Sequence, residues 1–387
     1  MNDSKHPKVK QTSVLKDLTS LGQSIWLDYI RRGILENGEL ERLIRESALR
    51  GVTSNPSIFE QAITGSDDYD AALQAMVGSG DAPKEVYEKL AIEDIQLAAD
   101  LFRGIYDKSD GGDGFVSLEV SPELALDTEG SMEEARRLWK SVDRPNVMIK
   151  IPGTLEGAPA IEELLYEGIN INITLLFSLE GHERVMEAYL RAIERRVEEG
   201  KPVERIASVA SYFVSRVDTA VDAQLEQKLA AAGSEDEKEK IRTLMGRAAI
   251  ANAKMAYQRF RAIFDSDRFR RLEESGAKVQ RPLWASTSTK NPEYRDVMYV
   301  EELIGPDTIN TMPLKTLEAF ADHGVAERTV DDDLAKARAE LAALDDLGID
   351  LDQITADLQK EGVEKFVKPF RELLTCVDEK MSEVAGR

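Results

Sequence analysis

Short apolar runs alternate with longer amphipathic segments along most of this chain. The runs are rich in β-branched and aromatic residues, which is typical of buried strands, and the segments between them have helical spacing. Eight such runs occupy residues 24–30, 51–56, 114–120, 147–152, 170–177, 206–213, 281–287 and 308–313. The chain therefore predicts eight strands, each separated from the next by at least one helix.

This alternation indicates an α/β protein with a (β/α)₈ TIM barrel and additional C-terminal helices. A doubly wound sheet is less well supported, because no G-x-G-x-x-G sequence follows the first strand. We expect residues 1–387 to form a single barrel domain. It would carry a helical insertion at about 214–275, with two or three helices and a charged hinge at 233–240, and extra helices at about 325–387.

Charge and composition narrow the classes of partner. The formal net charge of −22 argues against binding to nucleic acid or to an anionic membrane, since both require a basic surface. Cys376 is the single cysteine and the three histidines lie far apart, so we expect no disulfide within the chain and no Cys-rich or three-histidine metal site. The first 18 residues contain no apolar core of signal-peptide length, and no run could span a bilayer. A cytoplasmic location is therefore expected. We expect the protein to be a monomer or a homodimer.

Lys150 lies inside the apolar run at 147–152, where a charged side chain is unexpected. Burying an ammonium without a partner is costly, so such a lysine either pairs with a carboxylate or is kept as a neutral amine. A neutral buried lysine is the nucleophile that forms a Schiff base with a carbonyl. A lysine that only snorkels to the surface, or that forms a structural ion pair, is the simpler interpretation of this stretch alone.

Polar residues recur near the C-terminal ends of the predicted strands. In a barrel these ends meet at one mouth, where functional residues gather. A Schiff-base aldol reaction needs an amine, carboxylates for proton transfer, and amides and hydroxyls that hold a polyhydroxylated chain. The residue types at the strand ends match these needs: Asp28, Asn55, Glu119, Lys150, Asn172, Thr174 and Ser211. Each also has a structural interpretation, such as a turn at Asn55 before Pro56 or an ion pair of Asp28 with an arginine.

The segment 285–292, with the sequence ASTSTKNP, has the composition of a phosphate-binding loop. Ser286, Ser288 and Lys290 supply hydroxyls and a cation after the seventh strand, a usual phosphate position in this fold. Arg216, just after the sixth strand, is a second candidate for the same anion. Its alternative role is an ion pair with Asp218 or Asp222 at the start of a helix.

Six of these stretches together resemble the transaldolase family in its long form. They are GVTSNPSIFEQAI, VSLEVSPELALDT, VMIKIPGTLEG, INITLLFS, SYFVSRVD and WASTSTKNP. The resemblance extends from about residue 12 to at least residue 325, and it implies a class I aldolase-type barrel with no metal or organic cofactor. Its partners would be phosphorylated sugars.

The resemblance also implies a role for each motif residue. Lys150 would be the Schiff-base lysine, Glu119 the water-assisted acid/base, and Asp28 the group that handles the C4 hydroxyl. Thr174 would position the water. The dihydroxyacetone unit and the phosphate would be held by Asn55, Asn172, Ser211, Arg216 and Ser286. One departure is clear: the better-known short forms carry an arginine where this chain has Ser288, and Lys290 is the candidate replacement.

The expected activity is transfer of a dihydroxyacetone unit from a ketose phosphate to an aldose phosphate, as in the pentose phosphate pathway. Three alternatives stay open. The first is an aldolase that releases free dihydroxyacetone, and the second is a barrel that binds sugar phosphates without catalysis. The third and weakest is hydride transfer, for which no dinucleotide motif is present.

Overall fold

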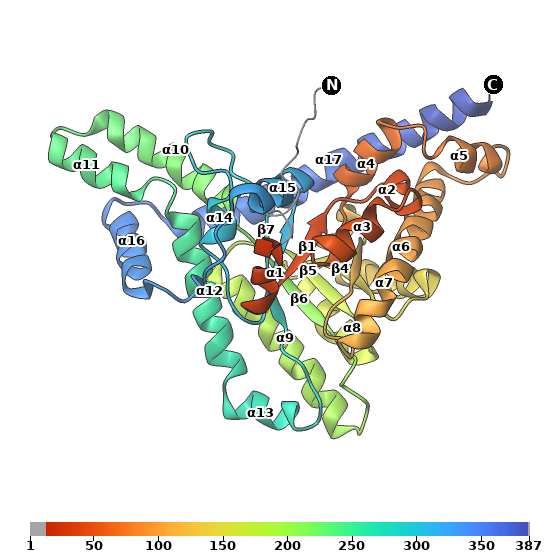
Figure 1. Ribbon diagram of the computed structural model, residues 1–387, viewed down its shortest axis with the longest axis horizontal. Helices are drawn as coiled ribbons and strands as arrows, with labels where there is room; N and C mark the ends of the chain where they lie inside the picture. The colour runs from red at the N-terminus through yellow and green to blue at the C-terminus, as the bar shows by residue number, and fades with distance from the viewer. Residues whose placement is uncertain (1–12, 386–387) are drawn as a thin grey trace, which may run out of the picture.

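A closed barrel of eight parallel strands forms the centre of the molecule (Figure 1). The computed structural model describes residues 13–385, so most of the N-terminal segment considered above for a signal peptide lies outside it. Each strand pairs with its neighbours in chain order, and β8 closes the barrel on β1. The strands are β1 (Gln23–Asp28), β2 (Leu49–Thr53), β3 (Val116–Glu119), β4 (Val147–Pro152), β5 (Ile171–Leu176), β6 (Ser208–Phe213), β7 (Arg281–Ala285) and β8 (Thr308–Met312). The predicted barrel and all eight predicted strands are confirmed.

Helices surround the barrel and extend beyond it on two sides. They are α1 (Ser13–Ser20), α2 (Arg32–Glu36), α3 (Glu39–Glu46), α4 (Pro56–Thr64), α5 (Asp70–Met76), α6 (Pro83–Lys108), η1 (Pro122–Leu124), α7 (Thr128–Val142), α8 (Gly157–Glu167), α9 (Leu179–Glu198), α10 (Ser215–Ala231), α11 (Glu235–Leu244), α12 (Ala248–Phe264), α13 (Asp267–Glu273), α14 (Met298–Glu301), α15 (Leu314–His323), α16 (Leu334–Asp346) and α17 (Leu351–Ala385). In Figure 1, α10 and α11 project to the left, while α17 runs to the upper right beside α4 and α5.

The segment between β6 and β7 differs from its prediction. It contains four helices, α10 to α13, instead of two or three. The charged run at 233–240 is not a hinge: Ser234 accepts a hydrogen bond from the backbone N–H of Glu237 and caps α11, and acidic residues follow in the first turn. Such residues are favourable at a helix N-terminus, so the run starts a helix.

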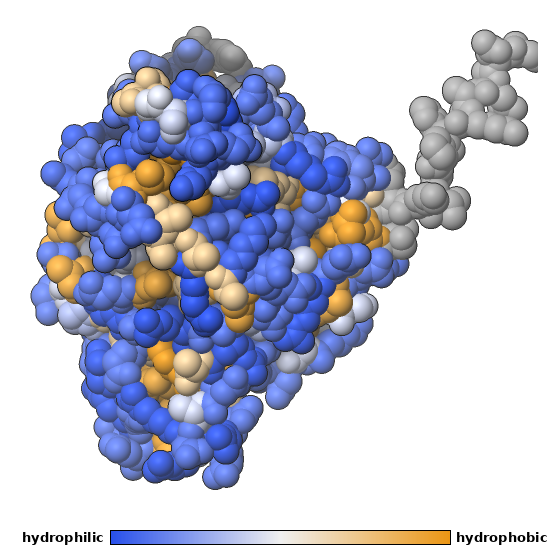
Figure 2. Space-filling model, turned by 90° about the vertical axis from the view of Figure 1, so that its left-hand side faces the viewer, coloured by the Kyte–Doolittle hydropathy of each residue, from blue (hydrophilic) through white to orange (hydrophobic). Residues whose placement is uncertain are grey.

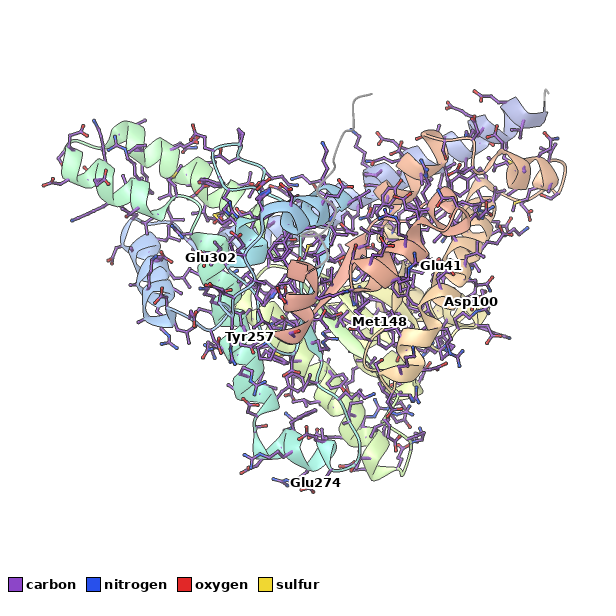
Figure 3. All side chains as sticks on the ribbon, in the orientation of Figure 1. Glu41, Asp100, Met148, Tyr257, Glu274 and Glu302 are labelled. Atoms are coloured by element: carbon purple, nitrogen blue, oxygen red, sulfur yellow. The ribbon has the colours of Figure 1, made fainter. Side chains whose placement is uncertain are left out.

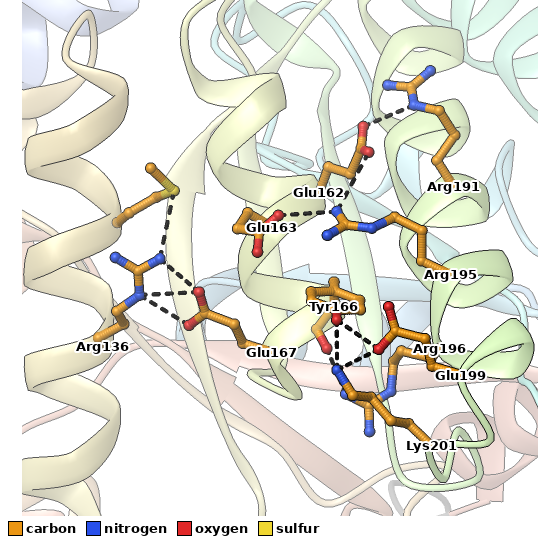
Figure 4. Close-up of polar contacts among 11 residues, drawn as sticks. Arg136, Glu162, Glu163, Tyr166, Glu167, Arg191, Arg195, Arg196, Glu199 and Lys201 are labelled. Atoms are coloured by element: carbon orange, nitrogen blue, oxygen red, sulfur yellow. Dashed lines mark hydrogen bonds and ion pairs between the residues drawn. The ribbon is translucent and has the colours of Figure 1, made fainter.

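The outer helices are joined by ion pairs, as Figure 4 shows for α7, α8 and α9. Arg136 on α7 pairs with Glu167 on α8, with a shortest N–O distance of 2.5 Å. Arg191 and Arg195 on α9 pair with Glu162 and Glu163 on α8, at 2.7 and 2.9 Å. Exposed pairs of this kind stabilise only slightly when taken singly. Together these pairs join α7, α8 and α9, which are successive helices of the outer ring.

The strands are buried on both faces, with helices outside and packed side chains inside. Met148 on β4 lies within the barrel in Figure 3, whereas Glu41, Asp100 and Glu274 lie at its periphery. The face drawn in Figure 2 is mostly hydrophilic, with apolar residues in small separate groups. Within residues 13–385, no helix has both the length and the apolar character that crossing a bilayer requires.

Candidate active site

A cavity opens at the C-terminal end of the barrel and encloses about 600 Å³ of empty space, part of it open to solvent. Its wall is mostly polar, although apolar side chains contribute on one side. It is lined by Asp28, Thr53, Asn55, Lys150, Thr174, Ser211, Phe213, Arg216, Ala285, Ser286, Ser288, Lys290, Thr311, Pro313 and Phe366. Nine of the eleven residues predicted from the sequence are in this set, and the other two, Glu119 and Asn172, lie directly against its members.

Lys150 points from β4 into the cavity and is almost fully buried. Its Nζ donates to Oε2 of Glu119 at 3.0 Å and to the backbone carbonyl of Ser54 at 3.2 Å. Glu119 is on the adjacent strand β3, in register with Lys150. Lys150 therefore does pair with a carboxylate, as the simpler interpretation predicted, but it does so at the mouth cavity.

Burial raises the pKa of Glu119, an effect only partly offset by the charge and hydrogen bond of Lys150. The other carboxylate oxygen, Oε1, is buried without a hydrogen-bond partner among the described residues. Buried polar atoms normally find partners, so an unpartnered oxygen is the type of atom that a substrate or a water engages. Glu119 is thus poised to exchange a proton with Lys150 or with a ligand next to it.

Asp28 is the last residue of β1 and the second carboxylate of the site. Removal from water raises its pKa, and this is opposed by a hydrogen bond from Thr53 and by the charges of Lys150 and Lys290. The Thr53 hydroxyl lies 2.7 Å from Oδ1 of Asp28 and 2.7 Å from the hydroxyl of Thr311 on β8. This chain of three side chains fixes the Asp28 carboxylate where a substrate hydroxyl can reach it.

The fifth and sixth strands supply hydroxyl and amide groups. Asn172 on β5 lies below the cavity and accepts a hydrogen bond from the Ser211 hydroxyl at 2.7 Å, while its amide donates to Ser117 at 2.9 Å. Asn172 therefore orients Ser211, which itself lines the cavity. Thr174 also lines it, and its buried hydroxyl has no hydrogen-bond partner within residues 13–385. The next residue, Leu175, has φ of 60°, a strained conformation for a branched side chain.

Asn55 caps a helix and also lines the cavity. Its Oδ1 accepts a hydrogen bond from the backbone N–H of Ile58 at 3.0 Å and caps α4, with Pro56 at the first helical position. This is a common helix start. Asn55 also lines the cavity, so its amide nitrogen is the group that a substrate would contact.

Two cations and two serines form the opposite side of the cavity. Lys290 donates to the Ser288 hydroxyl at 2.8 Å, and burial together with the charge of Arg216 lowers the pKa of Lys290. Burial likewise lowers the pKa of Arg216. Ser286 has φ of 56°, and its hydroxyl lies 2.9 Å from that of Ser215 at the start of α10. Mutually repelling cations beside a helix N-terminus are typical of an anion site, since a bound anion relieves the repulsion.

The alternative role of Arg216 is wrong, because both aspartates are engaged elsewhere. Asp218 accepts hydrogen bonds from the backbone N–H of Ala249 and from Tyr299, each at 2.7 Å. Asp222 accepts from the backbone N–H of Gly246 at 3.0 Å and from Tyr294 at 2.7 Å. These contacts join α10 to α12 and to the segment that follows residues 285–292. The Arg216 side chain is left to line the cavity.

Six further lining residues were not singled out as site residues by the sequence: Thr53, Phe213, Ala285, Thr311, Pro313 and Phe366. Thr53 and Thr311 lie near the ends of β2 and β8, and that position is a signal which could have found them. Phe213 ends β6 and Phe366 belongs to α17. Neither aromatic residue differs in type from the packing residues around it. Among residues 13–385, no group of three or more His, Cys, Asp or Glu side chains could hold a metal ion.

Comparison with known proteins agrees with this geometry. The family model described as "Transaldolase/Fructose-6-phosphate aldolase" matches residues 25–377. Proteins named transaldolase from Trichodesmium erythraeum, Saccharopolyspora erythraea and Thermobifida fusca are 45%, 47% and 46% identical to this chain. Each alignment covers 96% of this chain and 98–99% of the relative. The chain belongs to the transaldolase/fructose-6-phosphate aldolase family.

Proposed function

We propose that this chain is a transaldolase that works through a Schiff base on Lys150. The observation that carries the proposal is the buried Lys150–Glu119 pair, which lies against a cavity that also holds a second carboxylate and two cations. A binding protein for sugar phosphates needs the cations and the hydroxyls, but it needs neither a buried amine nor two carboxylates beside that amine. This combination favours catalysis over binding alone.

The first half-reaction would take a ketose phosphate, of the type of fructose 6-phosphate or sedoheptulose 7-phosphate. The Lys150 amine attacks C2 of the ketone, with Glu119 receiving a proton from nitrogen and returning it as the carbinolamine loses water. Asp28 then removes the proton from the C4 hydroxyl. The C3–C4 bond breaks, its electron pair moves toward the imine, and an aldose phosphate leaves.

The second half-reaction reverses these steps with another aldose phosphate, such as erythrose 4-phosphate or glyceraldehyde 3-phosphate. The enamine carbon attacks the aldehyde carbon, and Asp28 returns a proton to the new hydroxyl. Hydrolysis of the imine then releases the new ketose phosphate, which is three carbons longer than the acceptor, and restores the amine of Lys150. Asn55, Ser211 and Asn172 are assigned to the three-carbon unit, and Thr174 is assigned to the water that Glu119 uses.

Arg216, Lys290, Ser286 and Ser288 are assigned to the phosphate. They follow β6 and β7, which lie across the closed barrel from β3, and they line the same cavity as Lys150. A single substrate could therefore place its carbonyl at Lys150 and its phosphate at the cations. The chain's overall charge of −22 makes such a local cation cluster necessary for an anionic substrate. We place the reaction in the pentose phosphate pathway and in the cytoplasm, on the strength of the family resemblance.

Product analysis tests the proposal against its alternatives. The enzyme is incubated with fructose 6-phosphate and erythrose 4-phosphate, and all products are quantified. A transaldolase yields sedoheptulose 7-phosphate and glyceraldehyde 3-phosphate in equal amounts. Free dihydroxyacetone in amounts equal to glyceraldehyde 3-phosphate would instead establish the aldolase. Binding of either sugar phosphate without turnover would establish the non-catalytic barrel.

A further inference from the structure

The C-terminal helix α17 lies across the end of the barrel that carries the cavity. The side chain of Gln359 donates to the backbone carbonyls of Gly153 and Leu175, just beyond β4 and within β5, at 3.2 and 2.9 Å. Farther along, Lys380 donates to the backbone carbonyls of Ile63 and Ser66 near the end of α4. Since it is held on both sides of the mouth, α17 is a fixed part of the site's roof.

The helix α17 approaches β5 closely at Gly362. A Cβ atom at this position would lie 2.8 Å from Cδ2 of Leu175, so a larger residue here would require the Leu175 side chain to shift. One helical turn later, Phe366 is on the same face, and its ring centroid is 5.8 Å from Nζ of Lys150. Phe366 is only 7% exposed. The close packing of α17 at Gly362 and the position of the Phe366 ring near Lys150 thus lie on one face of the helix.

Phe366 differs in origin from the rest of the cavity wall. Of the lining residues within the described chain, it is the one that lies neither on a barrel strand nor on the segment directly following one. Other residues also anchor the helix: Phe370 packs edge-on against Tyr87 at 6.0 Å, and Leu373 is fully buried. Phe366 differs from them in that it also lines the cavity.

An apolar ring above Lys150 would control which reaction follows cleavage of the ketose. The enamine carbon has two fates. It can attack an acceptor aldehyde and form a C–C bond, which is transfer. Alternatively, it can take a proton from solvent; water then adds to C2 of the resulting iminium, the C–N bond breaks, and free dihydroxyacetone leaves while the amine is restored. The second fate requires solvent close to the carbon, and a side chain that excludes water suppresses such side reactions.

We propose that Phe366 is a specificity-determining residue, which sets the partition of the bound three-carbon unit toward transfer and away from release. This rests on the proposed function, because it presupposes the imine on Lys150. The ring also lies within the distance at which an aromatic face attracts a cation. An iminium forms in either fate, so this attraction does not itself set the partition, and the exclusion of water carries the proposal.

The test measures a ratio of products, which does not depend on how much of the enzyme is folded. Wild type, Phe366→Ala, Phe366→Leu and the control Leu373→Ala are each incubated with fructose 6-phosphate and erythrose 4-phosphate in D₂O. Free dihydroxyacetone is divided by sedoheptulose 7-phosphate. Leu373 is buried on the same helix but does not line the cavity, so Leu373→Ala reports the effect of loosening α17 alone.

We expect the ratio to rise severalfold in Phe366→Ala and less in Phe366→Leu, and to stay at the wild-type value in Leu373→Ala. The released dihydroxyacetone should carry one solvent deuteron on the carbon formerly bonded to C4. An unchanged ratio in both Phe366 variants, with the imine still trapped by borohydride on Lys150, would overturn the proposal, as would an equal rise in Leu373→Ala. Absence of any imine in the wild type would instead refute the proposed function, and this inference with it.

Discussion

Two buried ion pairs in this molecule have similar chemistry but different surroundings. Arg32, at the start of α2, donates to Asp94 on α6 at 2.8 Å and to Glu93 at 2.8 Å, and the other oxygen of Asp94 accepts from Tyr69 at 2.8 Å. Arg32 has a carboxylate partner on each side, and both oxygens of Asp94 accept a hydrogen bond. None of these residues lines the mouth cavity. It has the features of a structural pair.

The Lys150–Glu119 pair is incomplete by comparison. It has one hydrogen bond of 3.0 Å between the side chains and a lysine that borders the cavity, and Oε1 of Glu119 has no hydrogen-bond partner within residues 13–385. Burial alone therefore does not separate a structural pair from a catalytic one. What separates them is whether all polar atoms are satisfied and whether a substrate can reach the charge.

The largest expected effect is that of Lys150→Met, which removes the nucleophile. We expect complete loss of transfer activity with a retained fold, because methionine fits apolar surroundings and the raised pKa of Glu119 allows that carboxyl to be neutral. The matched control is Lys254→Met. Lys254, on α12, is equally buried and pairs with Glu302 at 3.5 Å, but it does not line the mouth cavity. Its variant should keep kcat. Measurable transfer by folded Lys150→Met would contradict the assignment.

The next largest effect is expected for Glu119→Gln. The amide cannot exchange the proton that imine formation requires, so kcat should fall by roughly 10²- to 10⁴-fold, the usual contribution of a general acid–base group. Steady-state kinetics and circular dichroism of the same preparations separate this loss from misfolding. A kcat within a few-fold of wild type would show that Glu119 is only a structural partner of Lys150.

For the Arg32–Asp94 pair, the comparison predicts a loss of stability and not of catalysis. Asp94→Asn leaves the buried guanidinium with only the half-exposed Glu93 as a charged partner, which should lower the free energy of unfolding by up to about 3–5 kcal/mol. Glu93→Gln changes the half-exposed member of the same cluster and should cost less than about 1 kcal/mol. Urea titrations give both values, and kcat of the folded variants should stay close to wild type. A selective loss of kcat in Asp94→Asn would remove the distinction between the two pairs.

Among the cavity residues, the smallest effect on activity is expected at the cations Arg216 and Lys290. Arg216→Met and Lys290→Met each remove one charged hydrogen-bond donor. If either group binds phosphate, kcat/KM for erythrose 4-phosphate should fall by about 10- to 100-fold, the value of a hydrogen bond to a charged group. Most of the change should appear in KM. Unphosphorylated D-glyceraldehyde is the control acceptor, and an equal loss with this acceptor would contradict a phosphate-binding role.

The sequence predicted the barrel well because each strand is buried on both faces and thus appears as a continuous apolar run. The position of polar residues at the C-terminal ends of these runs located most of the site, because the strand ends meet at the barrel mouth. Thr311 was missed because no polar residue was taken from the eighth strand, although its position follows the same rule.

Other features depend on contacts that the local sequence does not carry. Phe366 is one of several buried apolar residues along α17, and its residue type and spacing do not distinguish it from those that only pack against the barrel. Thr329 and Asp331 have the residue types of helix caps, but α16 begins only at Leu334. Thr329 instead donates through its hydroxyl to the backbone carbonyl of Glu301, so a distant segment, and not the helix, uses its polar groups.

The most direct test of the central claim is to trap the imine. The enzyme is treated with fructose 6-phosphate and borohydride, and its peptides are mapped by mass spectrometry. We predict a reduced adduct of the hexose phosphate or of the three-carbon unit on the peptide that contains Lys150, with none on the peptide that contains Lys254. Folded protein without an adduct, or with one on another lysine, would contradict the account.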